Sequence, residues 1–169
     1  MGLPKKLKNF AVFADGNSWL GEVPSITLPT ITRKVEDYRA GGMHGTVAID
    51  LGHEKLELAA KLGGLKQQLI EMFGATKAGA NSLRFAGAYQ ADDTGEVSAV
   101  EVAISGRLRE WNPGEAQAGE NKDEDATWDL TYYKLSIDGA DILEIDVPGM
   151  SFKVNGTEVY DSIRAALGV

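Results

Sequence analysis

The triplet Asp93-Thr94-Gly95 is the stretch with the most obvious chemical use, because aspartic proteases carry their reactive carboxylate on the same three residue types. Their mechanism requires two carboxylates that share one proton, each presented by a loop with apolar flanks. Here Asp92 precedes the triplet directly and Gln90 lies just before it, so the flank is polar. Short motifs often occur by chance. We therefore interpret the triplet as an exposed turn rather than as half of a protease site.

The two histidines offer a second candidate site, because His44 and His53 lie close in sequence to Asp50 and Glu54. Their spacing fits no zinc motif such as HExxH, and solvated or interface histidines are far more common than metal ligands. The acidic turn at 92–96 lacks the spacing of an EF-hand calcium loop. The sequence also shows no Ser-His-Asp signature, nucleophile elbow or phosphate-binding glycine loop. We expect no enzyme activity, no metal site and no cofactor.

The composition is that of an ordinary globular chain with an acidic surface. Of its 169 residues, 43% are hydrophobic and 25% are charged, and the formal net charge is -8. A tight nucleic-acid binder needs a basic surface to displace counterions, so stable DNA or RNA binding is disfavoured. The chain has no cysteine, and no apolar run reaches the roughly 20 residues of a membrane span. We expect one domain, residues 1–169, without disulfides or a membrane anchor.

The elements that would hold these residues are mostly strands. Alternating apolar and polar residues, as in 83–89, are typical of strands with one buried face. The segment 54–62 also alternates, although its composition is helix-forming as well. The dipeptides Asp-Gly and Asn-Gly at 15–16, 138–139 and 155–156 predict tight turns. The expected strands cover 9–14, 18–23, 54–62, 83–89, 97–111, 127–137 and 142–147, and a polar loop covers 112–126.

Two short helices complete the predicted fold. Apolar residues recur at helical spacing over 65–73, and Gly74 follows as a stop signal. The same spacing recurs over 159–167, directly before Gly168. We therefore expect a mainly β fold: an antiparallel β-barrel or sandwich with an extended hairpin arm, one short flanking helix and a C-terminal helix.

The extended hairpin arm, residues 26–52, is the most unusual stretch. It consists of two predicted strands joined by a glycine-rich tip at 40–45. Neither face of its first strand, 32–39, is apolar, whereas a strand on its own core should alternate apolar and polar residues. Eight extended residues span about 26 Å, and an isolated hairpin is only marginally stable in water. We interpret the arm as an assembly element that other copies of the chain complete.

A set of short segments, in fixed order over nearly the whole chain, points to one family. The segments are Thr27-Leu28-Pro29, Tyr38-Arg39-Ala40-Gly41-Gly42-Met43, Ile49-Asp50-Leu51-Gly52, Arg84-Phe85-Ala86-Gly87, Asp92-Asp93-Thr94-Gly95, Gly106-Arg107, Ala118-Gly119-Glu120, Tyr132-Tyr133-Lys134-Leu135, Glu144-Ile145-Asp146 and Asn155-Gly156. With them the sequence resembles the major tail tube proteins of contractile-tailed bacteriophages, a family that includes the tubes of R-type pyocins. Each segment alone is weakly specific, and 63–81 and 121–125 do not share the resemblance.

The resemblance implies a structural protein of the virion that is assembled in the cytoplasm of the bacterial host. Hexameric rings would stack into a hollow tube through which phage DNA passes without specific binding. The implied partners are other copies of the chain, the tail sheath protein, the tape-measure protein, the baseplate initiator and the tail terminator. We expect contacts between subunits and rings through Arg33, Tyr38, Arg39, Ala40, Gly41, Gly42, Met43 and His44. We expect the residues that face the bore to include Glu36, Asp50, Glu101 and Arg107.

Other functions stay open at this point. An R-type pyocin tube, or the ring-forming component of a type VI secretion system, has the same architecture and differs in its cargo. A monomeric β-sandwich binding module would explain the strands and turns, but it would not explain the polar first strand of the arm. A protease would depend on the single triplet at Asp93.

Overall fold

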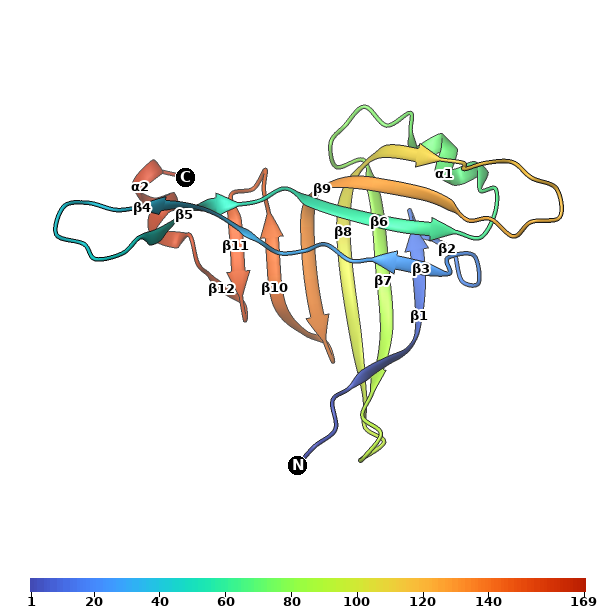
Figure 1. Ribbon diagram of the computed structural model, residues 1–169, viewed down its shortest axis with the longest axis horizontal. Coiled ribbons are helices and arrows are strands. Elements are labelled where there is room, and N and C mark those ends of the chain that lie inside the picture. Colours follow the sequence, from blue (N-terminus) through green and yellow to red (C-terminus); the bar gives the residue numbers. More distant parts are fainter.

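Two β layers run crosswise to each other in this structure, a computed structural model that describes residues 1–169 (Figure 1). The strands are β1 (Lys6–Ala14), β2 (Asn17–Ser18), β3 (Ser25–Thr27), β4 (Arg33–Tyr38), β5 (Val47–His53), β6 (Leu56–Leu62), β7 (Asn81–Gln90), β8 (Val97–Asn112), β9 (Glu124–Ile137), β10 (Ala140–Asp146), β11 (Ser151–Val154) and β12 (Thr157–Glu158). The helices are α1 (Gln67–Met72) and α2 (Asp161–Leu167). Both layers belong to one ten-stranded antiparallel sheet, ordered β12-β11-β10-β9-β8-β7-β1-β2, with β6 added to β9 and β3 to β6. The predicted mainly β, antiparallel fold with two helices is confirmed.

The long strands β8 and β9 join the two layers, because each of them contributes to both. The first part of β9 pairs with β6, and its last part pairs with β10. Along the β8–β9 pairing, bulges shift the register between Ser105 and Gly106 and again between Leu108 and Glu110, and such bulges let strands bend from one layer into the next. At Gly106 an added Cβ would overlap the carbonyl oxygen of Asp129. The bend therefore requires glycine at this position.

The core lies between the layers and follows from the alternation along the strands. In β6 every second residue is buried, so the segment 54–62 is a strand and not a helix. At the centre of the core the rings of Trp19 and Trp128 lie 6.4 Å apart, centroid to centroid, and both are almost fully buried. The indole Nε1 of Trp19 donates a hydrogen bond of 2.8 Å to Oε1 of Gln68 in α1. This bond fixes the short helix against one end of the core.

The predicted tight turns are confirmed. Both residues of Asp15-Gly16, Asp138-Gly139 and Asn155-Gly156 have positive φ. Positive φ at both central residues is the conformation of a type I′ turn, whose twist matches that of the strands it joins. These three turns set the register of the hairpins β1–β2, β9–β10 and β11–β12.

Some strand boundaries differ from the prediction for identifiable reasons. The strand predicted at 18–23 ends at Ser18. The side chain of Trp19 turns into the core there, and the main-chain N–H of Trp19 donates to the carbonyl of Val12 at 2.8 Å. The strand β9 begins in the acidic stretch that the prediction assigned to a loop. There Asp125 forms an ion pair of 3.4 Å with Lys61 on β6. The short strands β11 and β12 carry too few residues for alternation to predict them.

Both predicted helices are present, but they relate to the core differently. In α1, Leu69 and Met72 are buried and cover the end of the layers. In α2 no residue is buried, and the helix ends at Gly168 in the left-handed conformation. The apolar residues of α2 therefore face outward, and the single chain leaves them uncovered.

The strands β4 and β5 form a separate two-stranded sheet that projects sideways from the body of the molecule (Figure 1). We call residues 33–53 the ribbon. It is shorter than the hairpin arm expected at 26–52, because Ile26 and Thr27 pair with Ala60 and Ala59 of β6 and so belong to the main sheet.

Candidate assembly surface

The ribbon has one apolar face, which forms only when its two strands are paired. Tyr38 lies opposite Val47, and Glu36 lies opposite Ile49. Residues that face each other across strands have side chains on the same side of the sheet. Tyr38, Val47 and Ile49 are each about half exposed, so this face covers no core of its own chain. The first strand alone predicted no such face, because most of its apolar residues come from the returning strand.

The base of the ribbon is held by an ion pair on its exposed side. Nη1 of Arg33 lies 2.9 Å from Oδ2 of Asp50, and the N–H of Gly52 donates to Oδ1 of Asp50 at 2.8 Å. The Gly52 N–H, together with the charge of Arg33, lowers the pKa of Asp50 below its ordinary value. Arg33 was predicted at an interface and Asp50 in the bore, and the structure places the two side chains in contact.

The tip of the ribbon is an ordered turn. The N–H of Met43 donates to the carbonyl of Ala40, and Nε of Arg39 donates to the carbonyl of Met43, both at 3.2 Å. Met43 is half-buried, and the other predicted interface residues of the ribbon are exposed. The structure therefore leaves the tip free for contacts with other molecules, and its role at an interface stays a prediction.

The four predicted bore residues do not form one cluster. On β8, Glu101 pairs with Arg84 at 2.7 Å, and Arg107 donates to the carbonyl of Thr76 at 3.1 Å. Both side chains lie on the face of β8 that points away from the core residues Val102, Ile104 and Leu108. The other two predicted bore residues, Glu36 and Asp50, lie on the ribbon.

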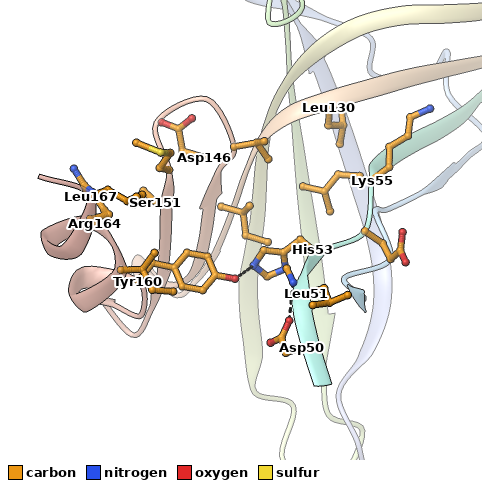
Figure 2. A pocket seen from close by; sticks show the side chains of 17 residues that line it. Asp50, Leu51, His53, Lys55, Leu130, Asp146, Ser151, Tyr160, Arg164 and Leu167 are labelled. Atoms are coloured by element: carbon orange, nitrogen blue, oxygen red, sulfur yellow. Dashed lines mark hydrogen bonds between the residues drawn. The ribbon is translucent and has the colours of Figure 1, made fainter. Parts of the chain in front are cut away.

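A groove lies between the base of the ribbon, the end of β10 and α2, and we call it the base groove (Figure 2). The hydroxyl of Tyr160 lies 3.0 Å from Nε2 of His53, which links the start of α2 to the end of β5. The ring of Phe152 meets the His53 ring edge-on, with centroids 4.6 Å apart. Sequence reasoning missed this groove, since no pattern connects residues 53 and 160. The only feature of the sequence that pointed to the groove was the apolar spacing over 159–167. That spacing predicted a helix, but it did not indicate which surface the helix lies against.

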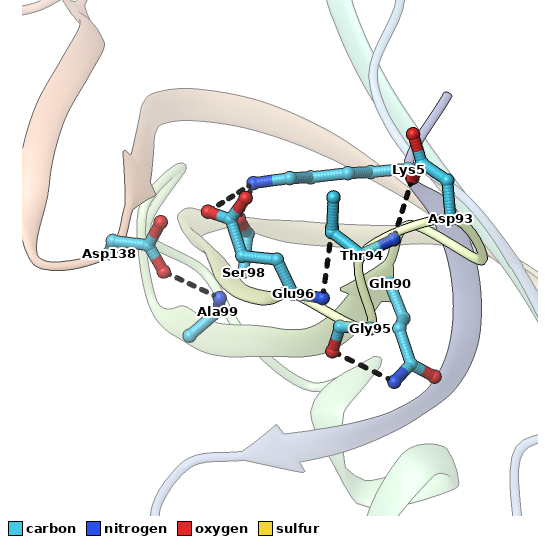
Figure 3. A network of polar contacts seen from close by, with 9 residues as sticks. All are labelled: Lys5, Gln90, Asp93, Thr94, Gly95, Glu96, Ser98, Ala99 and Asp138. Carbon is cyan, nitrogen blue, oxygen red and sulfur yellow. Dashed lines mark hydrogen bonds and ion pairs between the residues drawn. The ribbon is translucent and has the colours of Figure 1, made fainter. Parts of the chain in front are cut away.

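The Asp93-Thr94-Gly95 triplet forms a turn, as predicted, and this turn holds the N-terminal segment (Figure 3). The N–H of Leu3 donates to Oδ2 of Asp93 at 2.9 Å, and this bond lowers the pKa of Asp93. Two ion pairs hold the same segment: Lys5 Nζ to Glu96 Oε1 at 2.9 Å and Lys8 Nζ to Asp92 Oδ1 at 2.6 Å. The three acidic residues of the turn therefore position the first residues of the chain.

The structure contains no group of three or more His, Asp or Glu side chains placed to hold a metal ion. Neither of its helices has the length and apolar character needed to cross a membrane.

Comparison with known proteins identifies relatives that match the whole chain. The family model described as "Phage tail tube protein FII" matches residues 4–168. The chain is 42% identical over 172 aligned positions to the "Tail tube protein" of Escherichia phage P2, with 100% of both chains covered. It is 41% identical to the "Major tail tube protein" of Serratia phage KSP20, with 100% of this chain and 99% of that protein covered.

Among solved structures, the fold is similar to a chain in the sheath-tube complex of an extracellular contractile injection system, PVC, in its extended state. The TM-score is 0.58 at 12% sequence identity, and the match covers 79% of this chain and 91% of that chain. At this identity the similarity concerns the fold alone.

Proposed function

The chain belongs to the phage tail tube protein FII family, and from that premise we propose that six copies close into a ring and that such rings stack into the hollow tube of a contractile tail. The family is structural, so the chain is a tail tube protein and not an enzyme. Tail tube proteins are components of the virion, and we place the assembly of this one in the cytoplasm of the host.

The observation that best supports the ring is the size of the exposed surface. The single chain exposes 10562 Å². A compact monomer of its mass, 18.1 kDa, would expose about 8,100 Å². The excess of about 2,500 Å² reflects an open shape, and it leaves area for several contact patches of the usual 800 Å² per partner. A subunit in a stacked ring has two neighbours within the ring and further copies above and below, which fits this excess.

The ribbon supplies the second support. Its two strands pair only with each other, and no strand of the main sheet pairs with them. A two-stranded sheet is marginally stable alone in water, and the apolar face at Tyr38, Val47 and Ile49 gains stability only when another surface covers it. We assign the predicted contacts at Arg33 and at 38–44 to neighbouring subunits and to the adjacent ring.

A contact between rings that uses different surfaces on its two sides does not close on itself, so it propagates a filament. The length of such a filament must be set by a second protein, and we assign this role to the tape-measure protein. The remaining proposed partners are the tail sheath protein, the baseplate initiator and the tail terminator. The occurrence of a similar fold in a sheath-tube complex supports the first of these.

We propose that the tube conducts phage DNA without binding it. The chain carries a formal charge of -8, and an acidic wall repels phosphates, so DNA slides past it. The proposed bore residues are those of the prediction, with Glu101 and Arg107 on the outward face of β8 and Glu36 and Asp50 on the ribbon.

Negative-stain electron microscopy of the concentrated protein, combined with a solution mass, tests the proposal. We expect stacked rings in the images, and a particle of six times the 18.1 kDa chain mass when rings are separated. A protein that stays monomeric at every concentration would show that the surface excess has another cause and would favour a binding module.

A further inference from the structure

The ribbon is attached to the body of the molecule by very few contacts. Its strands pair only with each other, and the ion pair at its base and the turn at its tip both lie within it. Where the ribbon begins, the N–H of Glu54 donates to the carbonyl of Thr32 at 2.9 Å, which joins its two ends but not the main sheet. The one hydrogen bond from the ribbon to the rest of the chain is the bond of 3.0 Å between His53 and Tyr160.

The main chain at the base of the ribbon is built for a change of direction. Arg33 lies opposite His53 and Val35 lies opposite Asp50, so β5 has one extra residue in this stretch. Within it, Gly52 has a φ of +114°, and an added Cβ would meet nothing within 4 Å. Bulges and glycines of positive φ let a strand bend, and hinges form at the ends of elements. We therefore look to side chains for what fixes the direction of the ribbon.

The ring of His53, directly after Gly52, belongs to a group of three rings that we call the aromatic cluster. Its centroid lies 4.6 Å from that of Phe152 and 5.9 Å from that of Tyr160, and the last two lie 5.4 Å apart. These distances are in the range of favourable aromatic pairs. Nδ1 of His53 is buried without a partner, so the hydroxyl of Tyr160 makes the only hydrogen bond of the imidazole (Figure 2).

Tyr160 is itself held firmly against the main sheet and α2. The N–H of the preceding Val159 donates to the carbonyl of Phe152 at 2.7 Å, and Phe152 is a buried residue of β11. On the other side, the carbonyl of Tyr160 accepts from the N–H of Arg164 in α2 at 2.9 Å. No residue of α2 is buried, so the helix adds little to the core. What its first turn does is hold Tyr160 beside the ribbon.

We propose that Tyr160 is a positioning residue, whose side chain contacts His53 and so fixes the direction of the ribbon relative to the main sheet. This part of the inference concerns the single chain. Its consequence for assembly rests on the proposed tube. A ribbon that already points in one direction loses less conformational freedom when it docks on a neighbouring copy, whereas a pivoting ribbon docks only in the fraction of time that it points correctly.

Distances between two spin labels in the monomeric protein test the proposal, because the chain has no cysteine of its own. Gly41→Cys puts one label at the tip of the ribbon, where an added Cβ would meet nothing within 4 Å. Ser82→Cys puts the other at an exposed position of β7. By pulsed electron paramagnetic resonance we expect one narrow distance distribution, which Tyr160→Ala should broaden. A distribution that stays equally narrow in Tyr160→Ala would overturn the proposal.

The matched control is Tyr132→Ala on β9. Tyr132 is also half-buried, and its hydroxyl donates to a carboxylate oxygen of Glu144 at 2.9 Å, away from the ribbon. We expect this variant to keep the narrow distribution even where its melting temperature falls as far as that of Tyr160→Ala. Equal broadening in both variants would show a general loosening of the fold and would overturn the positioning role.

Tyr160→Phe separates the hydroxyl from the ring, because it removes only the hydrogen bond to His53. We expect a distribution of intermediate width. A width equal to that of the unmodified chain would overturn the part assigned to the hydroxyl and leave the contact to the rings.

Polymerisation gives a second readout, which depends on the proposed function. We expect Tyr160→Phe to raise the concentration at which tubes form by about two- to tenfold, the range that corresponds to one neutral hydrogen bond. Tyr132→Phe should leave it unchanged, and equal effects of the two variants would contradict the inference. If the unmodified chain forms no tubes, the proposed function fails, whereas the spin-label distances still decide the role of Tyr160. The two failures are therefore distinguishable.

Discussion

At Gly106 the strand β8 passes so close to β9 that a side chain has no room. In Gly106→Ala the new methyl group would overlap the Asp129 carbonyl, so one of the two backbones must move. We expect the free energy of unfolding to fall by about 1–3 kcal/mol, the usual range for overpacking, as measured by urea denaturation of the monomer. Gly45→Ala is the matched control, because its Cβ would meet nothing within 4 Å. Similar losses in both variants would contradict this account.

Glu158 organises the C-terminal strands and the start of α2 by accepting several hydrogen bonds. Its carboxylate accepts from Oγ of Ser151 at 2.6 Å, from the N–H of Phe152 at 2.8 Å and from the N–H of Tyr160 at 3.4 Å. The bond from Ser151, followed by that from Phe152, lowers the pKa of Glu158 below its ordinary 4.5. The charged form is therefore the one that stabilises the fold.

This lowered pKa predicts how stability changes with pH. A group whose pKa is lower in the folded state contributes stability above its unfolded pKa of 4.5 and loses it as the pH falls through the folded value. We expect Glu158→Gln to lower the melting temperature at neutral pH, and the difference from the unmodified chain to shrink as the pH falls below 4.5. Thermal unfolding followed by circular dichroism at several pH values measures both. A difference that is independent of pH would contradict the assignment.

The sequence predicted only part of what single residues do in the structure. The polar flank of Asp93 correctly predicted a turn instead of a protease site. What the turn does could not be predicted, because its partner Leu3 lies 90 residues away and the bond uses a main-chain N–H. Every residue type except proline has the same main-chain donor, so no pattern of side chains predicts this hydrogen bond.

The ribbon is an element that the rest of the fold does not need. Its strands pair with no other strand, and Val35 lies opposite Asp50, so Lys34 and Ile49 can be joined through two glycines. We expect this deletion of 35–48 to leave the melting temperature of the monomer nearly unchanged and to abolish stacking of rings in negative-stain images. A truncated chain that polymerises like the full one would contradict the assembly role of the ribbon.

Elements whose pattern lies in consecutive residues could be predicted, whereas elements that depend on contacts between distant residues could not. Strands such as β6 and β8 alternate because one face lies on the core, and the alternation is written into consecutive residues. The predicted strand 18–23 was wrong beyond Ser18, because Trp19 packs in the core against Trp128, which is distant in the sequence. The ribbon was recognised by the absence of a core pattern in its first strand, but its apolar face depends on pairing between strands.

At the scale of the whole molecule, the proposed bore can be located by labelling. Ala103→Cys lies two residues from Glu101 on the outward face of β8, and Lys61→Cys lies on the exposed face of β6. We expect both monomeric variants to react with a maleimide attached to a long polymer. In assembled tubes only Lys61→Cys should react, because the polymer cannot enter the bore. Reversed reactivity would place β6 at the bore and overturn the assignment of Glu101 and Arg107.

The candidate site illustrates the limit of a single sequence at this scale. The family was identifiable from short segments in fixed order, and the missing core face of the arm led to the prediction, still untested, that the arm acts in assembly. The base groove was not predictable, because it is lined by residues from 50–56, 145–151 and 160–167 that only the folded sheet brings together. Grooves of this kind depend on tertiary structure, and the composition of the chain does not predict them.

The uninterrupted course of β8 and β9 through both layers has a mechanical consequence. A load applied to one layer passes to the other along covalent main chain, without a hinge at which the layers could pivot. Compression of an assembled particle must therefore slide many strand-to-strand hydrogen bonds at once, so we expect stiff, brittle behaviour in nanoindentation rather than gradual flattening. If Gly106→Ala lowers the stiffness in the same measurement, the rigidity depends on the bend of β8 and β9 at Gly106.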